Sequence, residues 1–112
     1  MNLRASEFGT DTVISVLDPR IDAASAIRFK DQVREMTPES ADRVVLDLSQ
    51  VDFVDSSGLG AIVAVMKLLA PATRLELSGM GATVAKVFAL TRMDRVFSIH
   101  KCIEDAVPRA RT

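Results

Sequence analysis

Several residue types are scarce in this sequence, and each shortage excludes a class of protein. The chain has one cysteine, Cys102, so an intrachain disulfide is impossible and a reducing compartment suits it. It has no tryptophan or tyrosine, and its 4% of aromatic residues are all phenylalanine, which leaves poor platforms for stacking bases or sugars. The formal net charge is -1, so electrostatics give no reason to expect nucleic acid or an anionic membrane as a partner.

Long apolar runs are also missing. Residues 1–6 lack the apolar segment of a secretory signal. The longest strongly apolar run, residues 59–66, ends at Lys67 and is far shorter than the roughly 18–20 residues of a membrane span. With 112 residues and an ordinary balance of apolar and charged side chains, we expect one cytoplasmic domain over residues 1–112.

The hydrophobic pattern predicts strands that alternate with helices. Strands are expected at residues 3–8, 12–17, 43–48, 74–78 and 96–99, and helices at residues 23–36, 57–69, 82–91 and 104–107. The first two strands form a hairpin around a turn at residues 9–11. Because the other strands are separated by helices, the order indicates an α/β fold with a parallel or mixed sheet.

Two of the expected helices carry one apolar stripe each, which marks the face that packs on the sheet. The first stripe is Ala26, Phe29, Val33 and Met36, and the second is Val84, Val87, Phe88 and Thr91.

The helix expected at residues 57–69 is apolar on nearly all sides. Between Leu59 and Leu69 its only charged side chain is Lys67. Two interpretations stay open: the helix is buried all round, or it presents an apolar patch to another protein.

The segment from Asp55 to Gly60, Asp-Ser-Ser-Gly-Leu-Gly, lies between an expected strand and this helix. Helix capping accounts for one Asp or Ser at such a place. Here an acidic residue and two hydroxyls stand in a row, followed by two glycines that reduce bulk and allow another backbone to approach. A phosphate on a hydroxyl here would meet free backbone N–H groups and the positive end of the helix dipole.

The sequence lacks the residues that an enzymatic or cofactor-binding function of this segment would need. A serine nucleophile needs a base, and the single histidine, His100, stands near the last expected strand; the G-x-S-x-G elbow is absent. The phosphate-binding and dinucleotide-binding glycine motifs are incomplete, and Cys102 with His100 makes no recognisable zinc site. We therefore predict no hydrolase activity, no metal and no cofactor.

These residues together resemble the STAS domain family, and in particular the bacterial anti-sigma factor antagonists. The resemblance rests on the strand, the Asp-Ser-Ser-Gly-Leu-Gly segment and the apolar helix. Other parts of the family pattern are matched by residues 20–24, 45–48, 51–55 and 90–97. It covers nearly the whole chain. Pro19 and Arg92 depart from the pattern, since the family often has glycine at both positions.

The resemblance implies both a fold and a function. The fold is a single STAS-type domain, with a mixed sheet of about 4–5 strands and about four helices packed mainly on one face. The function is binding, without enzymatic activity, to an anti-sigma factor that is also a serine kinase. That kinase phosphorylates the antagonist and so releases it, and a phosphatase reverses the modification.

Carried over to this chain, the resemblance names a set of site residues. Ser57 is the expected phosphate acceptor, and Ser56 is the second choice. Asp22 matches a family acidic residue that contributes to partner binding, although an acidic residue before a helix is also explained by the helix dipole. The expected partner contacts are Asp22, Asp55, Ser56, Gly58 and Leu59. The alternative is a STAS module that is never phosphorylated and serves as a scaffold or as a regulatory subunit of a transport system.

Overall fold

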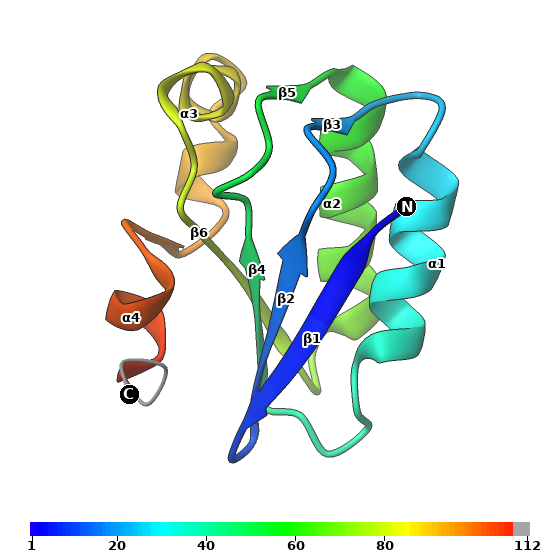
Figure 1. Ribbon diagram of the computed structural model, residues 1–112, viewed down its shortest axis with the longest axis vertical. Helices are drawn as coiled ribbons and strands as arrows, with labels where there is room; N and C mark the ends of the chain where they lie inside the picture. The colour runs from blue at the N-terminus through cyan, green and yellow to red at the C-terminus, as the bar shows by residue number, and fades with distance from the viewer. Residues whose placement is uncertain (109–112) are drawn as a thin grey trace.

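The computed structural model describes residues 1–108, and within them the chain forms two sheets and four α-helices (Figure 1). The strands are β1 (Leu3–Phe8), β2 (Asp11–Val16), β3 (Arg20–Ile21), β4 (Arg43–Asp47), β5 (Phe53–Val54), β6 (Arg74–Ser78) and β7 (Ile99–His100). The helices are α1 (Ala26–Met36), α2 (Ser56–Leu69), α3 (Ala82–Leu90) and α4 (Ile103–Ala106), with a 3₁₀ turn, η1, at Met93–Arg95. None of the helices among these residues is long and apolar enough to cross a bilayer.

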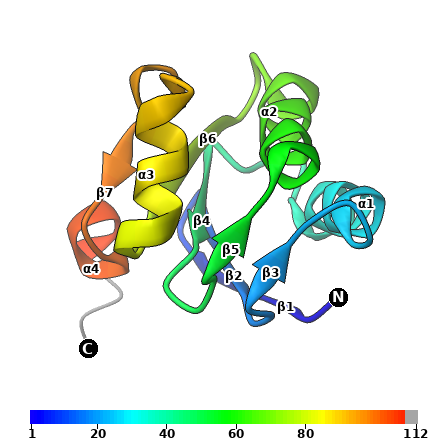
Figure 2. The same cartoon turned by 90° about the horizontal axis from the view of Figure 1, so that it is seen from above.

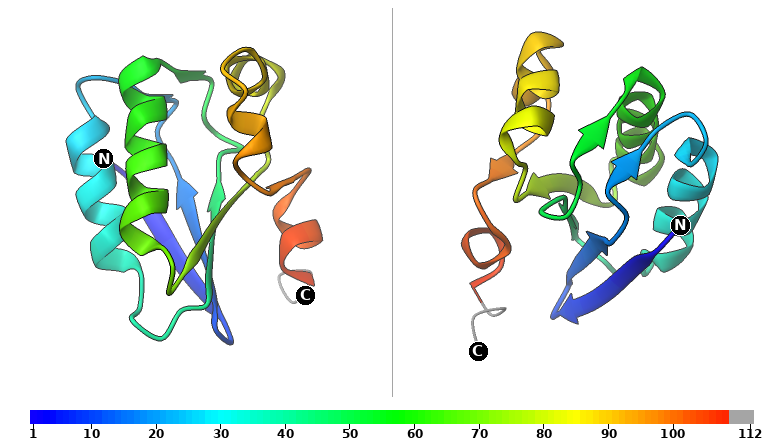
Figure 3. Two further views of the ribbon diagram at one scale, coloured as in Figure 1. Left: turned by 180° about the vertical axis from the view of Figure 1, so that it is seen from behind. Right: turned by 45° about the horizontal axis from the view of Figure 1, so that its top comes forward.

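The main sheet has five strands in the order β1-β2-β4-β6-β7. The hairpin partner β1 is antiparallel to β2, and the remaining neighbours are parallel. The expected α/β fold with a mixed sheet is therefore confirmed. Helices α1 and α2 lie side by side against one face of this sheet, and both begin at the same end of the molecule (Figures 1 and 3).

Most of the core lies on this face of the sheet. Alternate residues of β4 divide between the two faces because side chains of a strand point in alternating directions. Val44 and Leu46 join the main core with Phe29 of α1 and Phe88 of α3, whereas Val45 points to the other face. Within the described part of the chain, the short helix α4 covers that second face and forms a small cluster with it (Figure 2).

A network of charges ties α4 to the sheet. The guanidinium of Arg43 donates to both carboxylate oxygens of Asp11 at 3.2 and 2.9 Å, to Glu76 at 2.9 Å and to the carbonyl of Ala106 in α4 at 2.8 Å. His100 Nε2 lies 2.8 Å from Glu76 Oε1. The hydrogen bonds that Arg43 donates to Asp11 are the main reason that the pKa of Arg43 is raised. The largely buried side chain of Arg43 therefore links its own strand, β4, to β2, β6 and α4.

The start of α1 differs from its expected position at Ala23. The helix begins at Ala26, because Asp22 and Ser25 hold the intervening residues in a turn. The Asp22 N–H donates to Ser25 Oγ at 3.1 Å, and Asp22 Oδ1 accepts from the N–H of Ala24 at 3.1 Å. Short polar side chains compete in this way with the helical hydrogen-bond pattern. The predicted stripe is otherwise confirmed at its centre, where Phe29 and Val33 are fully buried.

The last strand was also predicted too early in the chain. The strand is Ile99–His100, and the preceding residues form η1 and a turn. The N–H groups of Val96 and Phe97 both donate to the carbonyl of Met93, at 3.0 and 3.3 Å, which excludes an extended chain there. Phe97 is buried and meets Phe88 edge-to-face, with ring centroids 6.1 Å apart. Phe97 is therefore an apolar residue of the core and not part of a strand.

Two smaller differences lie around α3. The helix ends at Leu90, and Thr91, which was assigned to the buried stripe, is exposed. Arg92 follows with a φ of 60°, a left-handed conformation that glycine adopts at little cost. This is one of the two positions at which the sequence departs from the family's glycine.

Candidate functional site

The small sheet of β3 and β5 was not expected from the sequence, and it builds the site. In this parallel pair Arg20 is opposite Phe53 and Ile21 is opposite Val54. The carbonyl of Ile21 also accepts the N–H of Asp55 at 3.3 Å. Two segments that are distant in the sequence therefore leave the small sheet side by side, one toward α1 and the other into α2 (Figure 2).

Asp55 joins these two segments through its carboxylate. Its Oδ1 accepts the N–H of Gly58 at 2.8 Å, which makes Asp55 the N-cap of α2. Its Oδ2 accepts the N–H of Ala23 at 3.2 Å, across the gap to the turn before α1. Both oxygens are engaged, so the capping interpretation holds for Asp55 and leaves the two serines inside the first turn of the helix.

The two glycines of the segment have different roles. A Cβ on Gly58 would lie 2.0 Å from the carbonyl oxygen of Ile21, so only glycine lets α2 come this close to β3. Gly58 is buried, and little of it is left for a partner to touch. A Cβ on Gly60 would meet nothing within 4 Å. The predicted approach of another backbone is thus confirmed at Gly58, within the chain itself.

Ser56 and Ser57 are the first two residues of α2, and both are exposed. Among the described residues, neither hydroxyl makes a hydrogen bond. Their surroundings differ, because Ser57 lines a groove between α1 and α2 and Ser56 does not. Ser57 shares that side of α2 with Ala61 and Ala64, at helical spacings of four and three residues.

Asp22 lies at the edge of the same surface. Its carboxylate accepts a hydrogen bond from Arg20 Nε at 3.2 Å, and this contact is the main reason that the pKa of Asp22 lies below its usual range. Arg20 in turn stacks over the ring of Phe53, with 4.2 Å between the guanidinium carbon and the ring centroid. The side chain of Asp22 is thus held by Arg20 in a half-exposed position.

The apolar helix behind the serines is mostly buried. Ala61, Ile62 and Val65 point into the core, and Leu59 is half-buried against it. Burial is complete on one side because α2 packs against both the sheet and α1. Leu68 is the large apolar side chain of this helix left open, at 50% exposure. Of the two interpretations, burial explains most of the helix.

Two exposed apolar residues at this surface were missed in the sequence. Ile27 of α1 is 71% exposed and lines the groove beside Ser57, and Phe53 is 37% exposed under Arg20. Ile27 stands off the apolar stripe of its helix, which was the available signal. Phe53 belongs to a strand too short to show an alternating pattern.

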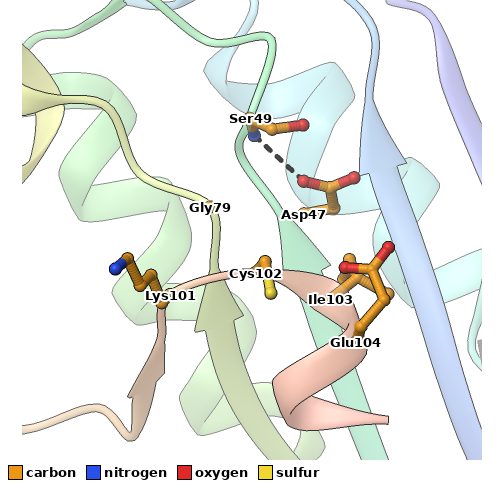
Figure 4. Close-up of a pocket in the computed structure, with 7 residues that line it drawn as sticks. All are labelled: Asp47, Ser49, Gly79, Lys101, Cys102, Ile103 and Glu104. Atoms are coloured by element: carbon orange, nitrogen blue, oxygen red, sulfur yellow. Dashed lines mark hydrogen bonds between the residues drawn. The ribbon is translucent and has the colours of Figure 1, made fainter. Parts of the chain in front are cut away.

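A second hollow, of about 280 Å³, lies at the ends of β4, β6 and β7 beside the start of α4 (Figure 4). Asp47 accepts the N–H of Ser49 there at 3.0 Å (Figure 4). Cys102 lies between β7 and α4 and lines this hollow. Neither serine of the candidate site does so, and no group of three or more metal-ligating side chains was found within residues 1–108.

His100 does not serve the two serines as a base. Its Nε2 forms a hydrogen bond with the carboxylate of Glu76. Glu76 lies on the face of the sheet that α4 covers, since it alternates with Leu77 of the main core. The sheet therefore separates the imidazole from the first turn of α2. Within residues 1–108 the two serine hydroxyls are exposed and have no hydrogen-bonded base.

Comparison with known proteins gives one family and a consistent fold. The model of the STAS domain family matches residues 5–106. A Thermotoga maritima protein, assigned by inference as an anti-sigma factor antagonist, is 29% identical over 103 residues, which cover 90% of this chain and 91% of the relative.

Solved structures show the same fold at lower identity. The anti-sigma factor antagonist SpoIIAA of Bacillus, in its unphosphorylated form, has a TM-score of 0.75 and 21% identity, and the match covers 98% of this chain and 96% of that one. SpoIIAA in its phosphorylated form has a TM-score of 0.68 and 20% identity over 98% and 100% of the two chains. Murine Solute Carrier 26 family member A9, an anion transporter, has a TM-score of 0.79 and 22% identity, and the match covers 96% of this chain and 19% of the transporter.

Proposed function

Because the chain belongs to the STAS domain family, we propose that it is a cytoplasmic anti-sigma factor antagonist whose binding is switched by phosphorylation of Ser57. Its partner is an anti-sigma factor that is also a serine kinase, and a serine phosphatase restores the unmodified form. The likeness to SpoIIAA, a protein solved in both its unphosphorylated and phosphorylated forms, supports this proposal.

The observation that carries the proposal is the contrast between the serines and the residues that surround them. Each oxygen of the Asp55 carboxylate accepts one backbone N–H, and Gly58 packs against β3 with no room for a side chain. The hydroxyl of Ser57 has no hydrogen bond within the described residues and is open to solvent. A kinase can therefore reach this hydroxyl without unfolding anything.

The same geometry supports Ser57 over Ser56 as the acceptor. Ser57 lies beside an apolar groove with Ile27 at its rim, so a partner that fills the groove covers this hydroxyl. Ser56 lies outside the groove. A phosphate on Ser57 therefore meets the bound partner most directly.

The partner surface extends from Ser57 over the ends of both segments. In this proposal Asp22, Asp55, Ser56 and Leu59 contribute the polar and apolar contacts that the partner makes around the acceptor. Gly58 contributes from beneath, because it sets the position of the first turn of α2.

The energetics suffice for a switch without refolding. Phosphorylation adds about 1.5–2 negative charges at neutral pH. The first turn of a helix tolerates such charge, so the domain itself stays folded. A partner built for a neutral serine offers no cation of its own for the phosphate, and burying the added charge costs it about 2–5 kcal/mol. That corresponds to a loss of roughly 30- to 4,000-fold in affinity.

The experiment compares native protein with Ser57→Ala, Ser57→Asp and the neighbouring control Ser56→Ala. Each is incubated with candidate serine kinases of the anti-sigma factor type and ATP, weighed by intact-mass spectrometry, and tested for binding by pull-down. Native protein and Ser56→Ala gain one phosphate, Ser57→Ala gains none and binds constitutively, and Ser57→Asp binds weakly. Tight binding of Ser57→Asp to the kinase would contradict the proposal.

One alternative is favoured by a specific likeness. The fold is shared with a segment of an anion transporter, so a STAS module that is never phosphorylated and regulates a transport system is the second candidate. An unchanged mass with every candidate kinase, together with co-purification of a transport protein, would favour it.

A further inference from the structure

The groove that Ser57 lines has one charged member, Lys30. It is a depression of about 160 Å³ between α1 and α2. Helix α1 contributes Ala26, Ile27 and Lys30, and α2 contributes Ser57, Ala61 and Ala64. The three alanines have small side chains that leave space between the helices, and Lys30 and Ser57 both line that space.

The direction of the two helices brings these side chains toward each other. Both helices begin at the same end of the molecule (Figures 1 and 3), and Ser57 is the second residue of α2. Lys30 lies one turn into α1. Long side chains of a helix lean toward its N-terminus, so the ammonium of Lys30 is carried toward the end at which Ser57 stands.

Lys30 is available for a new partner. Across residues 1–108, its half-buried side chain takes part in no ion pair or hydrogen bond. The guanidinium of Arg20, by contrast, already forms a salt bridge with Asp22 and stacks on the ring of Phe53. An anion added at Ser57 thus meets one uncommitted cation within its own groove.

We propose that Lys30 is the counter-ion of phosphorylated Ser57, and that the phosphate and the ammonium form an ion pair across the groove between α1 and α2. This inference rests on the proposed function for its biological meaning. Phosphorylation then changes the partner surface twice, because it adds a dianion and also removes a free cation from the groove. Ser56 lies outside this groove.

The test is a ³¹P NMR titration of protein carrying phosphoserine installed at position 57 during translation, which needs no kinase. The second pKa of phosphoserine is near 6, and a nearby cation lowers it. Removing the cation with Lys30→Gln raises this pKa by roughly 0.2–0.7 unit, the size expected for an exposed pair. Lys30→Arg keeps the native value.

Two controls separate the ion pair from general charge effects. Lys67→Gln removes the same charge ten positions further along α2, about 15 Å away at 1.5 Å per residue, and leaves the pKa unchanged. Phosphoserine at position 56 responds less to Lys30→Gln than phosphoserine at position 57. Equal pKa values in the native and Lys30→Gln proteins, or an equal effect of Lys67→Gln, would overturn the inference.

The result is independent of the proposed switch. If no kinase modifies Ser57 but Lys30→Gln raises the pKa of the installed phosphoserine, the ion pair stands and the phosphorylation proposal fails. If a kinase modifies Ser57 and Lys30→Gln has no effect on the pKa, the ion pair alone fails.

Discussion

Two polar regions of this molecule are built from similar residues and differ in how they are satisfied. Beneath α4, the carboxylates of Asp11 and Glu76 pair with Arg43, and the guanidinium also holds the backbone of α4. At the first turn of α2, Asp55 takes backbone N–H groups on both oxygens, and the two serine hydroxyls beside it have no hydrogen bond among the described residues.

The difference separates a structural use of polar groups from a functional one. Buried charges must be paired, and once paired they hold the elements around them in place. An exposed hydroxyl on a rigid helix costs nothing to leave without a protein partner, because water satisfies it, and it is then free to react. The α4 face should therefore respond to mutation in stability, and the serines should respond in binding.

The largest expected effect is at Arg43. Arg43→Met removes the cation that Asp11 and Glu76 share, together with its hydrogen bond to the carbonyl of Ala106, and destabilises the fold by about 3 kcal/mol. The matched control is Arg74→Met, since Arg74 also pairs with Glu76, at 3.4 Å, but is 73% exposed and costs less than about 1 kcal/mol. Urea unfolding measures both, and equal losses would contradict the comparison.

The next effect distinguishes the two glycines of the serine region. Gly58→Ala forces a methyl group against the Ile21 carbonyl and costs about 2–3 kcal/mol. Gly60→Ala has open space around the new methyl and gains about 0.5–1 kcal/mol from the better helix propensity. Thermal unfolding shows opposite signs for the two variants if the packing is as described. A loss of stability in both would mean that Gly60 is also confined.

The smallest effect is the pH dependence that Glu76 confers. Burial by itself raises the pKa of Glu76, but hydrogen bonds from His100 and Arg43 outweigh it, so the pKa lies below its usual value. A carboxyl with a depressed folded pKa stabilises the protein above its unfolded pKa of about 4.3, and this contribution is lost as the pH falls through the folded pKa.

The measurement is the free energy of unfolding between pH 6 and about pH 3, over which carboxyl groups titrate. Native protein loses more stability than Glu76→Gln on acidification across this range. Glu39→Gln, at an exposed position, follows the native curve. If the free energy of unfolding fell equally in the native protein and in Glu76→Gln, another carboxylate would be responsible for the loss of stability at low pH.

Local patterns in the sequence account for most of the fold. The β1–β2 hairpin, β4, β6 and the extents of α2 and α3 follow from hydrophobic period and turn residues, and the structure agrees within a residue or so. The errors fall where two local preferences compete. A hydrogen bond between Asp22 and Ser25 holds a turn where the first turn of the helix was expected. Phe97 is a residue type that favours strands, but here it follows a 3₁₀ turn and is buried in the core.

The sequence by itself determined the elements, their order and the presence of a hydroxyl cluster at a helix start, because these depend on residues that are neighbours along the chain. Only the tertiary structure decided how that cluster is used. It pairs β3 with β5, sets Asp55 against Ala23, makes Gly58 indispensable while Gly60 is not, and places Lys30 in the groove of Ser57. The physical reason is that two-residue strands and contacts between distant segments have no periodicity of their own. They exist only when the packed core brings the segments together.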